Sequence, residues 1–383
     1  MRVSGSIACA AVTILAGCQS QAIGAPGAQV HIPYWQATHS AREACGGSRL
    51  GEAQCDVLIE NGVHSTYAGW SARDLQKAYD LPITKGRGQS VYIVDAYDNP
   101  DVKGDFAAYR KGMGLPAGTL NKYNQDGQTS NYPQGSPNWG VEIDLDVEMA
   151  SAGCPKCTID LVEANSNQWS DIGAAEEEAV TLGGTIVSNS YSGSGASESD
   201  YDTKGVTYLA SAGDDGGGVY EPAAFDRVIS VGGTFLNTDS SSKRGYSEVV
   251  WPDTGGGCST QPKPKWQKDP DCKYRTANDI AAVAVNVAEY DSYDEGGWIT
   301  VDGTSISSPL VAGMVGLAGN STKQDGGKML WTLSLAEQKK YLYSVGEGDD
   351  GQCHDYLCGC GTKWLGRYCG PAGWGSPHGV RAL

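Results

Sequence analysis

The sequence predicts an α/β domain with a mostly parallel central sheet, helices on both faces and disulfide bonds that staple its loops. From about residue 67 onward, short apolar runs typical of strands alternate with helical stretches, and such alternation favours a parallel sheet covered on both faces. The chain has 383 residues, of which 40% are hydrophobic, so it can form a large core and is not mainly disordered. Twelve cysteines, most of them close to another cysteine, indicate the disulfides.

The first helix is expected just after residue 71. Ser71 is placed to cap this helix, and Asp74 occupies the capping-box position. A second helix is expected over residues 102–112. Apolar runs typical of strands cover residues 91–94, 159–162, 186–187, 206–209 and 228–231.

The first residues of the chain indicate export from a bacterial cell. The apolar run over residues 7–16 is too short to span a bilayer as a mature helix. Residues 15–18 read Leu-Ala-Gly-Cys and resemble a bacterial lipobox, which would leave Cys18 as a lipidated N-terminus, whereas ordinary cleavage a few residues later would give a secreted protein. We therefore expect a lipoprotein-type signal peptide over 1–18, a tether or short pro-region with little periodic structure over 19–66, and the main domain over 67–383.

The cysteines also suit an oxidising compartment. Removing Cys9 with the signal peptide and Cys18 with the lipid leaves ten, an even number as a disulfide framework requires. Pairing near neighbours would join Cys45 with Cys55, Cys154 with Cys157, Cys258 with Cys272, Cys353 with Cys358, and Cys360 with Cys369, although the sequence does not fix connectivity. A less favoured alternative makes Cys154 and Cys157 a redox pair and forms a zinc cluster from Cys353, His354, Cys358, Cys360 and Cys369.

The charge of the chain excludes polyanionic partners. With 28 basic and 45 acidic residues the net charge is −17, which repels nucleic acid and anionic membrane surfaces. We expect membrane contact only through the N-terminal lipid, and a monomer.

The most informative segment for chemistry is residues 301–318. Pro309 is tolerated early in a helix, so the helix should begin near Ser305 and place this hydroxyl at its N-terminus. The positive end of the helix dipole would favour the alkoxide that develops when a serine attacks a carbonyl. Alternatively, Thr304 and Ser305 are only caps of the helix.

A serine nucleophile needs a base, and histidine is a poor candidate here. The usual base is histidine. Three of the five histidines precede the main domain and two lie in the cysteine-rich tail: His31, His39, His64, His354 and His378.

Carboxylates are better placed to act as the base. Over residues 139–150, apolar residues recur at helical spacing and predict an amphipathic helix. Glu142 and Asp146 then lie on one face, where two close carboxylates tend to share a proton. Asp144 and Glu148 have the same spacing, and a solvated acidic face is a further alternative.

Asp214 follows the strand-like run that ends at residue 209. A group at the carboxyl end of a parallel strand is well placed to act on a ligand. Asp214 could stabilise a tetrahedral oxyanion only as a neutral acid, which would require low pH. The alternative is an ordinary turn aspartate before glycines.

Together these segments resemble the sedolisin family of serine-carboxyl peptidases from about Tyr67 to Leu383. The resemblance is carried by three motifs in order: Glu142-x-x-x-Asp146, Ser211-Ala212-Gly213-Asp214 and Gly303-Thr304-Ser305-x-x-x-Pro309. It implies a subtilisin-like fold and an acid-acting serine endopeptidase that works through an acyl-enzyme.

The resemblance also implies the role of each residue. Ser305 would attack the peptide carbonyl, Glu142 would accept and return its proton, and Asp146 would orient Glu142. Asp214 would donate to the oxyanion. The register of the motif therefore favours Glu142 and Asp146 over the pair at 144 and 148. Asp95, after the first strand, is a minor rival for the orienting acid.

The resemblance implies calcium near the C-terminus, but the two aspartate ligands are replaced by Ser344 and Cys369. Losing two carboxylates should weaken such a site severely unless Asp349, Asp350 or Asp355 substitutes. We therefore expect no required cofactor. The alternatives to an acid peptidase are a catalytically silent scaffold lipoprotein with this fold and a histidine-dependent enzyme that acts at neutral pH.

Overall fold

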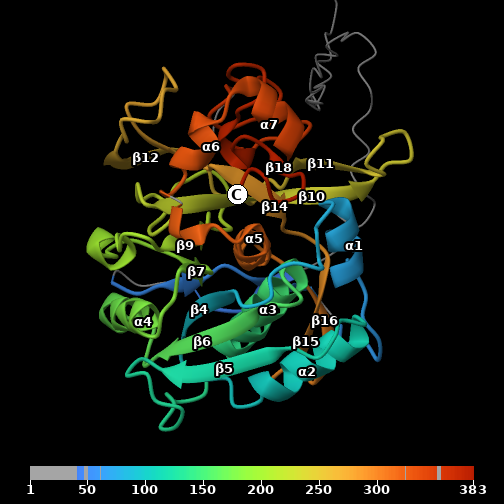
Figure 1. Ribbon diagram of the computed structural model, residues 1–383, viewed down its shortest axis with the longest axis vertical. Helices are drawn as coiled ribbons and strands as arrows, with labels where there is room; N and C mark the ends of the chain where they lie inside the picture. The colour runs from blue at the N-terminus through green and yellow to red at the C-terminus, as the bar shows by residue number, and fades with distance from the viewer. Residues whose placement is uncertain (1–40, 47–50, 61, 324, 352–354) are drawn as a thin grey trace, which may run out of the picture. The chain divides into compact units, whose positions relative to one another are not determined.

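A mostly parallel sheet forms the centre of the domain (Figure 1). The computed structural model describes residues 41–46, 51–60, 62–323, 325–351 and 355–383. Within these residues the sheet has the strand order β11-β10-β9-β7-β4-β6-β5, and β14 pairs with β10. Its strands are β4 (Ser90–Ala96), β5 (Thr119–Asn124), β6 (Thr158–Ala164), β7 (Ile186–Asn189), β9 (Thr207–Ser211), β10 (Val228–Thr238), β11 (Tyr246–Val250) and β14 (Ile280–Val283).

All pairs of this sheet are parallel except β10 with β11. Strands β4 and β6 are buried along almost their whole length because α3 (Pro137–Gly153) and α4 (Trp169–Thr181) pack on them from opposite faces. Helix α5 (Thr304–Ala318) lies beside α3 and packs on β7, β9 and β14 (Figure 1). The prediction of an α/β domain with helices on both faces is confirmed.

The first two helices match their predictions, and α3 differs in one respect. Ser71 and Asp74 form the capping box of α1 (Ala72–Ala78), and α2 spans Val102–Gly112. Helix α3 is not amphipathic towards solvent, because every residue from Trp139 to Gly153 is buried. It is surrounded by α1, α2, α5 and β15 (Val287–Asp291), so its carboxyls are enclosed and the interpretation of a solvated acidic face is wrong.

Folded structure begins earlier than residue 67. Strands β1 (Ala41–Glu43) and β3 (Leu58–Glu60) join β16 (Gly297–Asp302) and β15 in a second sheet, in the order β1-β3-β16-β15. Strand β2 (Gln54–Cys55) pairs with β8 (Tyr191–Ser192). The described residues from 41 onward belong to one unit with the rest of the domain, so residues 41–46, 51–60 and 62–66 of the expected tether are structured. The signal peptide and Cys18 lie outside the described residues.

The remaining elements lie mainly in the C-terminal part of the chain. They are β12 (Gly257–Pro262), β13 (Tyr274–Ala277), β17 (Leu342–Tyr343), β18 (Ser376–Pro377), α6 (Lys328–Thr332), α7 (Leu335–Tyr341) and short 3-10 turns at Glu198–Tyr201, Ser321–Lys323 and Gly370–Ala372. None of the helices in the described ranges has the length and hydropathy needed to cross a bilayer.

Four of the five predicted disulfides are present: Cys45–Cys55, Cys154–Cys157, Cys258–Cys272 and Cys360–Cys369. Cys358 is also disulfide-bonded, while its predicted partner Cys353 lies outside the described residues, as does His354. The zinc alternative is wrong, because Cys360 and Cys369 are bonded to each other and have no thiolate to offer.

Candidate active site

Ser305 lies buried in the first turn of α5, which begins one residue earlier than the expected start. Gly303 precedes the helix with a φ of 143°, in the region that favours glycine. A Cβ at this position would lie 2.2 Å from the carbonyl oxygen of Asp56 and 2.8 Å from Oδ2 of Asp214. Gly303 therefore allows the segments of Asp56 and Asp214 to approach the start of α5 closely.

Ser190, directly after β7, makes two contacts with Ser305. The Ser305 hydroxyl donates to the Ser190 carbonyl over 3.4 Å, and the Ser190 hydroxyl donates to the Ser305 carbonyl over 3.5 Å. That carbonyl would normally accept from residue 309, but Pro309 has no N–H to donate. The sequence reasoning missed Ser190, although its position after a parallel strand was the available signal.

Glu142 and Asp146 lie in the same buried site as Ser305. Burial raises the pKa of Glu142 well above 4.5, and the nearby Asp146 adds to this rise. Hydrogen bonding with the Ser305 hydroxyl acts in the opposite direction and lowers the pKa of Glu142. In this structure the Ser305 hydroxyl donates to the Ser190 carbonyl. Because a hydroxyl hydrogen can rotate, the same group can instead donate to Glu142.

Asp146 lies close to Glu142 and to Ser190 in the same buried site. Burial raises the pKa of Asp146 well above 3.8, whereas hydrogen bonds with Ser190 and Glu142 lower it. Ser305, Glu142 and Asp146 are therefore neighbours in one buried cluster, although neither carboxyl has a hydrogen-bond partner of normal geometry among the described residues. This arrangement can move a proton away from the serine and return it.

Asp95 is a further acid in this cluster. It lies near the end of β4, is fully buried, and has a pKa that burial raises to about 8. Its charge would raise the pKa of both Glu142 and Asp146. From the sequence, Asp95 was only a minor rival for the orienting acid, because the strand does not reveal which helix packs against it.

Asp214 is held beside the turn that precedes Ser305 by Thr304. Its Oδ1 accepts hydrogen bonds from the Thr304 N–H at 2.8 Å and the Thr304 hydroxyl at 2.7 Å. Oδ2 is buried and has no hydrogen-bond partner among the described residues. Burial, followed by the charge of Asp56, raises the pKa of Asp214 well above 3.8, so Asp214 stays a neutral acid beyond the usual range.

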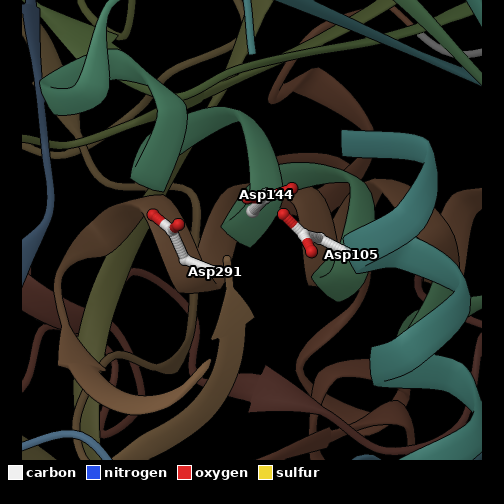
Figure 2. Close-up of side chains that lie close together, drawn as sticks. All are labelled: Asp105, Asp144 and Asp291. Carbon is white, nitrogen blue, oxygen red and sulfur yellow. The ribbon is translucent and has the colours of Figure 1, made fainter. Parts of the chain in front are cut away.

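The other acidic pair of α3 faces a different cluster. Asp144 lies next to Asp105 of α2 and Asp291 of β15, with oxygen atoms from all three within 4.8 Å of one another (Figure 2). All three are buried, and burial raises the pKa of each. Such a cluster can share protons in acid or offer oxygen ligands to a hard cation. Glu148 accepts from the backbone N–H of Tyr290 on the same side of the helix.

A lysine lies where the family resemblance would place calcium. Lys363 Nζ donates to the carbonyls of Val345 at 2.6 Å and Gly346 at 2.9 Å, and reaches Ser344 Oγ at 3.4 Å. Cys369 is engaged in its disulfide. The oxygen atoms around Ser344 thus already have a cationic partner in Lys363. That the protein requires no cofactor stays a prediction.

The two histidines in the described ranges are engaged elsewhere. His64 forms a backbone bridge with Trp298, and the His378 ring stacks on Tyr343 with centroids 4.4 Å apart. Among the described residues, no histidine is within hydrogen-bond distance of Ser305.

The chain is similar in sequence and in fold to known serine peptidases. A model of the subtilase family (Peptidase_S8) matches residues 144–337, a range that includes Asp214 and Ser305 and starts two residues after Glu142. The search of curated proteins found no match. Among solved structures, a Pseudomonas sedolisin (serine-carboxyl proteinase) in complex with pseudo-iodotyrostatin is similar, with a TM-score of 0.69 and 21% identity over 82% of this chain and 96% of that chain. Sphericase has a TM-score of 0.50 and 16% identity over 82% of this chain and 98% of its own. At these identities the likeness shows a subtilisin-like fold.

Proposed function

Because this chain belongs to the subtilase family of serine peptidases, we propose that it is a serine-carboxyl endopeptidase of the sedolisin type that acts on proteins or peptides at acidic pH. The observation that carries the proposal is the buried cluster of Ser305, Glu142 and Asp146, with a carboxyl in the place where a histidine would otherwise act. The intact cluster also argues against a silent scaffold.

The reaction would begin with attack of the Ser305 oxygen on the peptide carbonyl carbon. Glu142 in its ionised form, a stronger base because its pKa is raised, accepts the serine proton and then delivers it to the leaving amine as the carbon–nitrogen bond breaks. Asp146, which lies next to Glu142, would orient it by sharing a proton with it. Water then hydrolyses the resulting ester by the same steps in reverse order and restores the Ser305 hydroxyl.

The oxyanion of the tetrahedral intermediate would be stabilised by two donors. One is the backbone N–H of Ser305, in the first turn of α5. The other is a proton on Oδ2 of Asp214, the oxygen that Thr304 leaves free. Since only the neutral acid can donate, activity should be present at low pH and be lost as pH rises and Asp214 ionises.

Export is part of the proposal. The disulfides and the fold suit an extracellular protein. We propose that the chain is exported from a bacterial cell and is either lipid-anchored through Cys18 or secreted, and that it works as a monomer without a required metal.

The test is cleavage of a denatured protein substrate from about pH 3 to about pH 8. We expect activity confined to acidic pH, and a loss of at least about a thousandfold in Ser305→Ala and Glu142→Gln. The matched control is Glu148→Gln, which changes an equally buried acid of the same helix that faces the other cluster. Circular dichroism checks that each variant folds. Activity at neutral pH that survives Glu142→Gln would refute the carboxyl mechanism, and a folded but inactive wild-type protein would favour the scaffold.

A further inference from the structure

Residues 54–60 of this chain run directly across the proposed active site. On one side of the nucleophile, β2 pairs antiparallel with β8, with Cys55 opposite Tyr191. On the other side, β3 pairs antiparallel with β16, with Leu58 opposite Asp302. Because β16 leads straight into Gly303 and Ser305, the two residues between these strand pairs, Asp56 and Val57, must pass over the nucleophile.

The backbone contacts place the Asp56 carbonyl on the group that would bind an oxyanion. The Ser305 N–H donates to the Asp56 carbonyl oxygen over 3.2 Å. A Cβ on Gly303 would lie 2.2 Å from this oxygen and 3.0 Å from the Cα of Val57, so both sides of the Asp56–Val57 bond contact the turn before the nucleophile. A substrate carbonyl about to be attacked requires the same position.

The Asp56 side chain enters a pocket built from hydroxyl groups. Its Oδ1 accepts from the Ser192 hydroxyl at 2.7 Å, and its Oδ2 accepts from the Ser211 hydroxyl at 2.6 Å. Ser192 belongs to β8 and Ser211 ends β9, so two separate strands each supply one partner. Asp56 is buried, and burial, with a contribution from the charge of Asp215, raises its pKa to about 7. The pocket therefore holds a carboxylic acid in its neutral form at acidic pH.

We propose that the pocket formed by Ser192 and Ser211 selects an acidic side chain immediately before the cleaved bond, and that the Asp56–Val57 bond is its intramolecular substrate. This inference rests on the proposed function and adds a substrate class to the same site. A side chain without a carboxyl group would leave the two hydroxyls without these partners, which disfavours its binding.

The intramolecular step follows the proposed mechanism. The Ser305 oxygen forms an ester with the Asp56 carbonyl carbon, the bond to the Val57 nitrogen breaks, and Glu142 passes the serine proton to that nitrogen. Water then hydrolyses the ester, which leaves a carboxyl terminus on Asp56, an amino terminus on Val57 and a free Ser305 hydroxyl. The Cys45–Cys55 disulfide stays within the N-terminal piece. Until this piece leaves, it blocks other substrates.

The first experiment follows the full chain at about pH 4 by intact mass and N-terminal sequencing. We expect a new N-terminus at Val57 in the wild-type protein, and none in Ser305→Ala or Asp56→Leu. Exposed Asp126→Asn is the control and should be processed as the wild type.

The second experiment compares peptides that differ only in the residue before the cleaved bond, Asp, Asn, Leu or Lys. We expect Asp to be preferred over Leu by roughly tenfold or more in kcat/KM, and this ratio to fall when Ser192 and Ser211 are both changed to Ala. The ratio remains informative if Asp56→Leu does not fold, because it is measured without that variant.

The outcomes separate the inference from the proposed function. Cleavage of a denatured protein that depends on Ser305, with no cut after Asp56 and no preference for Asp, would overturn the inference and leave the function standing. An unchanged preference in the Ser192 and Ser211 variant would also overturn it. No Ser305-dependent cleavage of any substrate would overturn the function itself.

Discussion

Replacing Asp95 by Asn should flatten the dependence of the unfolding free energy on pH. Burial raises the pKa of Asp95 to about 8 in the folded protein, against the usual 3.8. The folded state therefore keeps a proton that the unfolded chain releases above about pH 4. The sign follows: this contribution to stability is complete below about pH 4 and is lost as pH rises towards about 8.

The size of the effect can be worked from this shift. One group that titrates only in the unfolded state changes the unfolding free energy by about 1.4 kcal/mol per pH unit. Between pH 4.5 and 6.5 the unfolding free energy of the wild-type protein should fall by about 3 kcal/mol through Asp95 alone. This is an upper bound, because water can enter the site when the acid ionises. That is a large part of the ~5–15 kcal/mol by which domains are usually stable.

The assay is urea unfolding followed by tryptophan fluorescence at several pH values, with Ser305→Ala in the background to prevent self-digestion. Asp95→Asn does not titrate, so its stability curve should be shallower than that of the parent. Exposed Asp126→Asn is the control and should follow the parent. Parallel curves for Asp95→Asn and the parent from pH 4.5 to 6.5 would refute the reasoning.

Three further outcomes are expected. Thr304→Val removes the hydroxyl that fixes Asp214, so kcat for peptide cleavage should fall by roughly ten- to a hundredfold with KM nearly unchanged; an equal change in KM would point to substrate binding instead. A chelator should leave the melting temperature unchanged, whereas Lys363→Met should lower stability by about 1–3 kcal/mol because three oxygen acceptors lose their donor; a clear drop with the chelator would instead reveal a bound cation. Changing Cys360 and Cys369 to Ser should cost about 2–3 kcal/mol, measured by urea unfolding, and equal midpoints would contradict this.

Local patterns in the sequence were enough for several elements of the main domain, but not for others such as α4, β5 and the strands β11 to β16. The capping box at Ser71 and the apolar runs of the sheet are read from neighbouring residues, and the structure has the expected helices and strands there. The pairing of close cysteines was equally local. Strands β1, β2 and β3 escaped prediction because runs of two or three residues carry no alternation, and they form only by pairing with distant strands.

The faces of α3 show where local reasoning stops. Both acidic pairs have the same spacing, and helical periodicity alone cannot say which faces the nucleophile. The structure places Asp144 beside Asp105 and Asp291 (Figure 2). It places Glu142 beside Ser305, because α5 packs against one side of the helix and α2 with β15 against another. The family resemblance had favoured the same pair from its motif.

The sequence by itself determined the class of fold and the segments that hold Ser305, Glu142, Asp146 and Asp214, since each depends on residues close together in the chain. Only the tertiary structure decided that Asp95 and Ser190 belong to the site and that Asp56 covers it. Asp56 and Ser211 are 155 positions apart, and a hydrogen bond between them exists only after several strands have paired in register. Burial, which raises the pKa values of these acids, is likewise a property of the packed domain and not of any one segment.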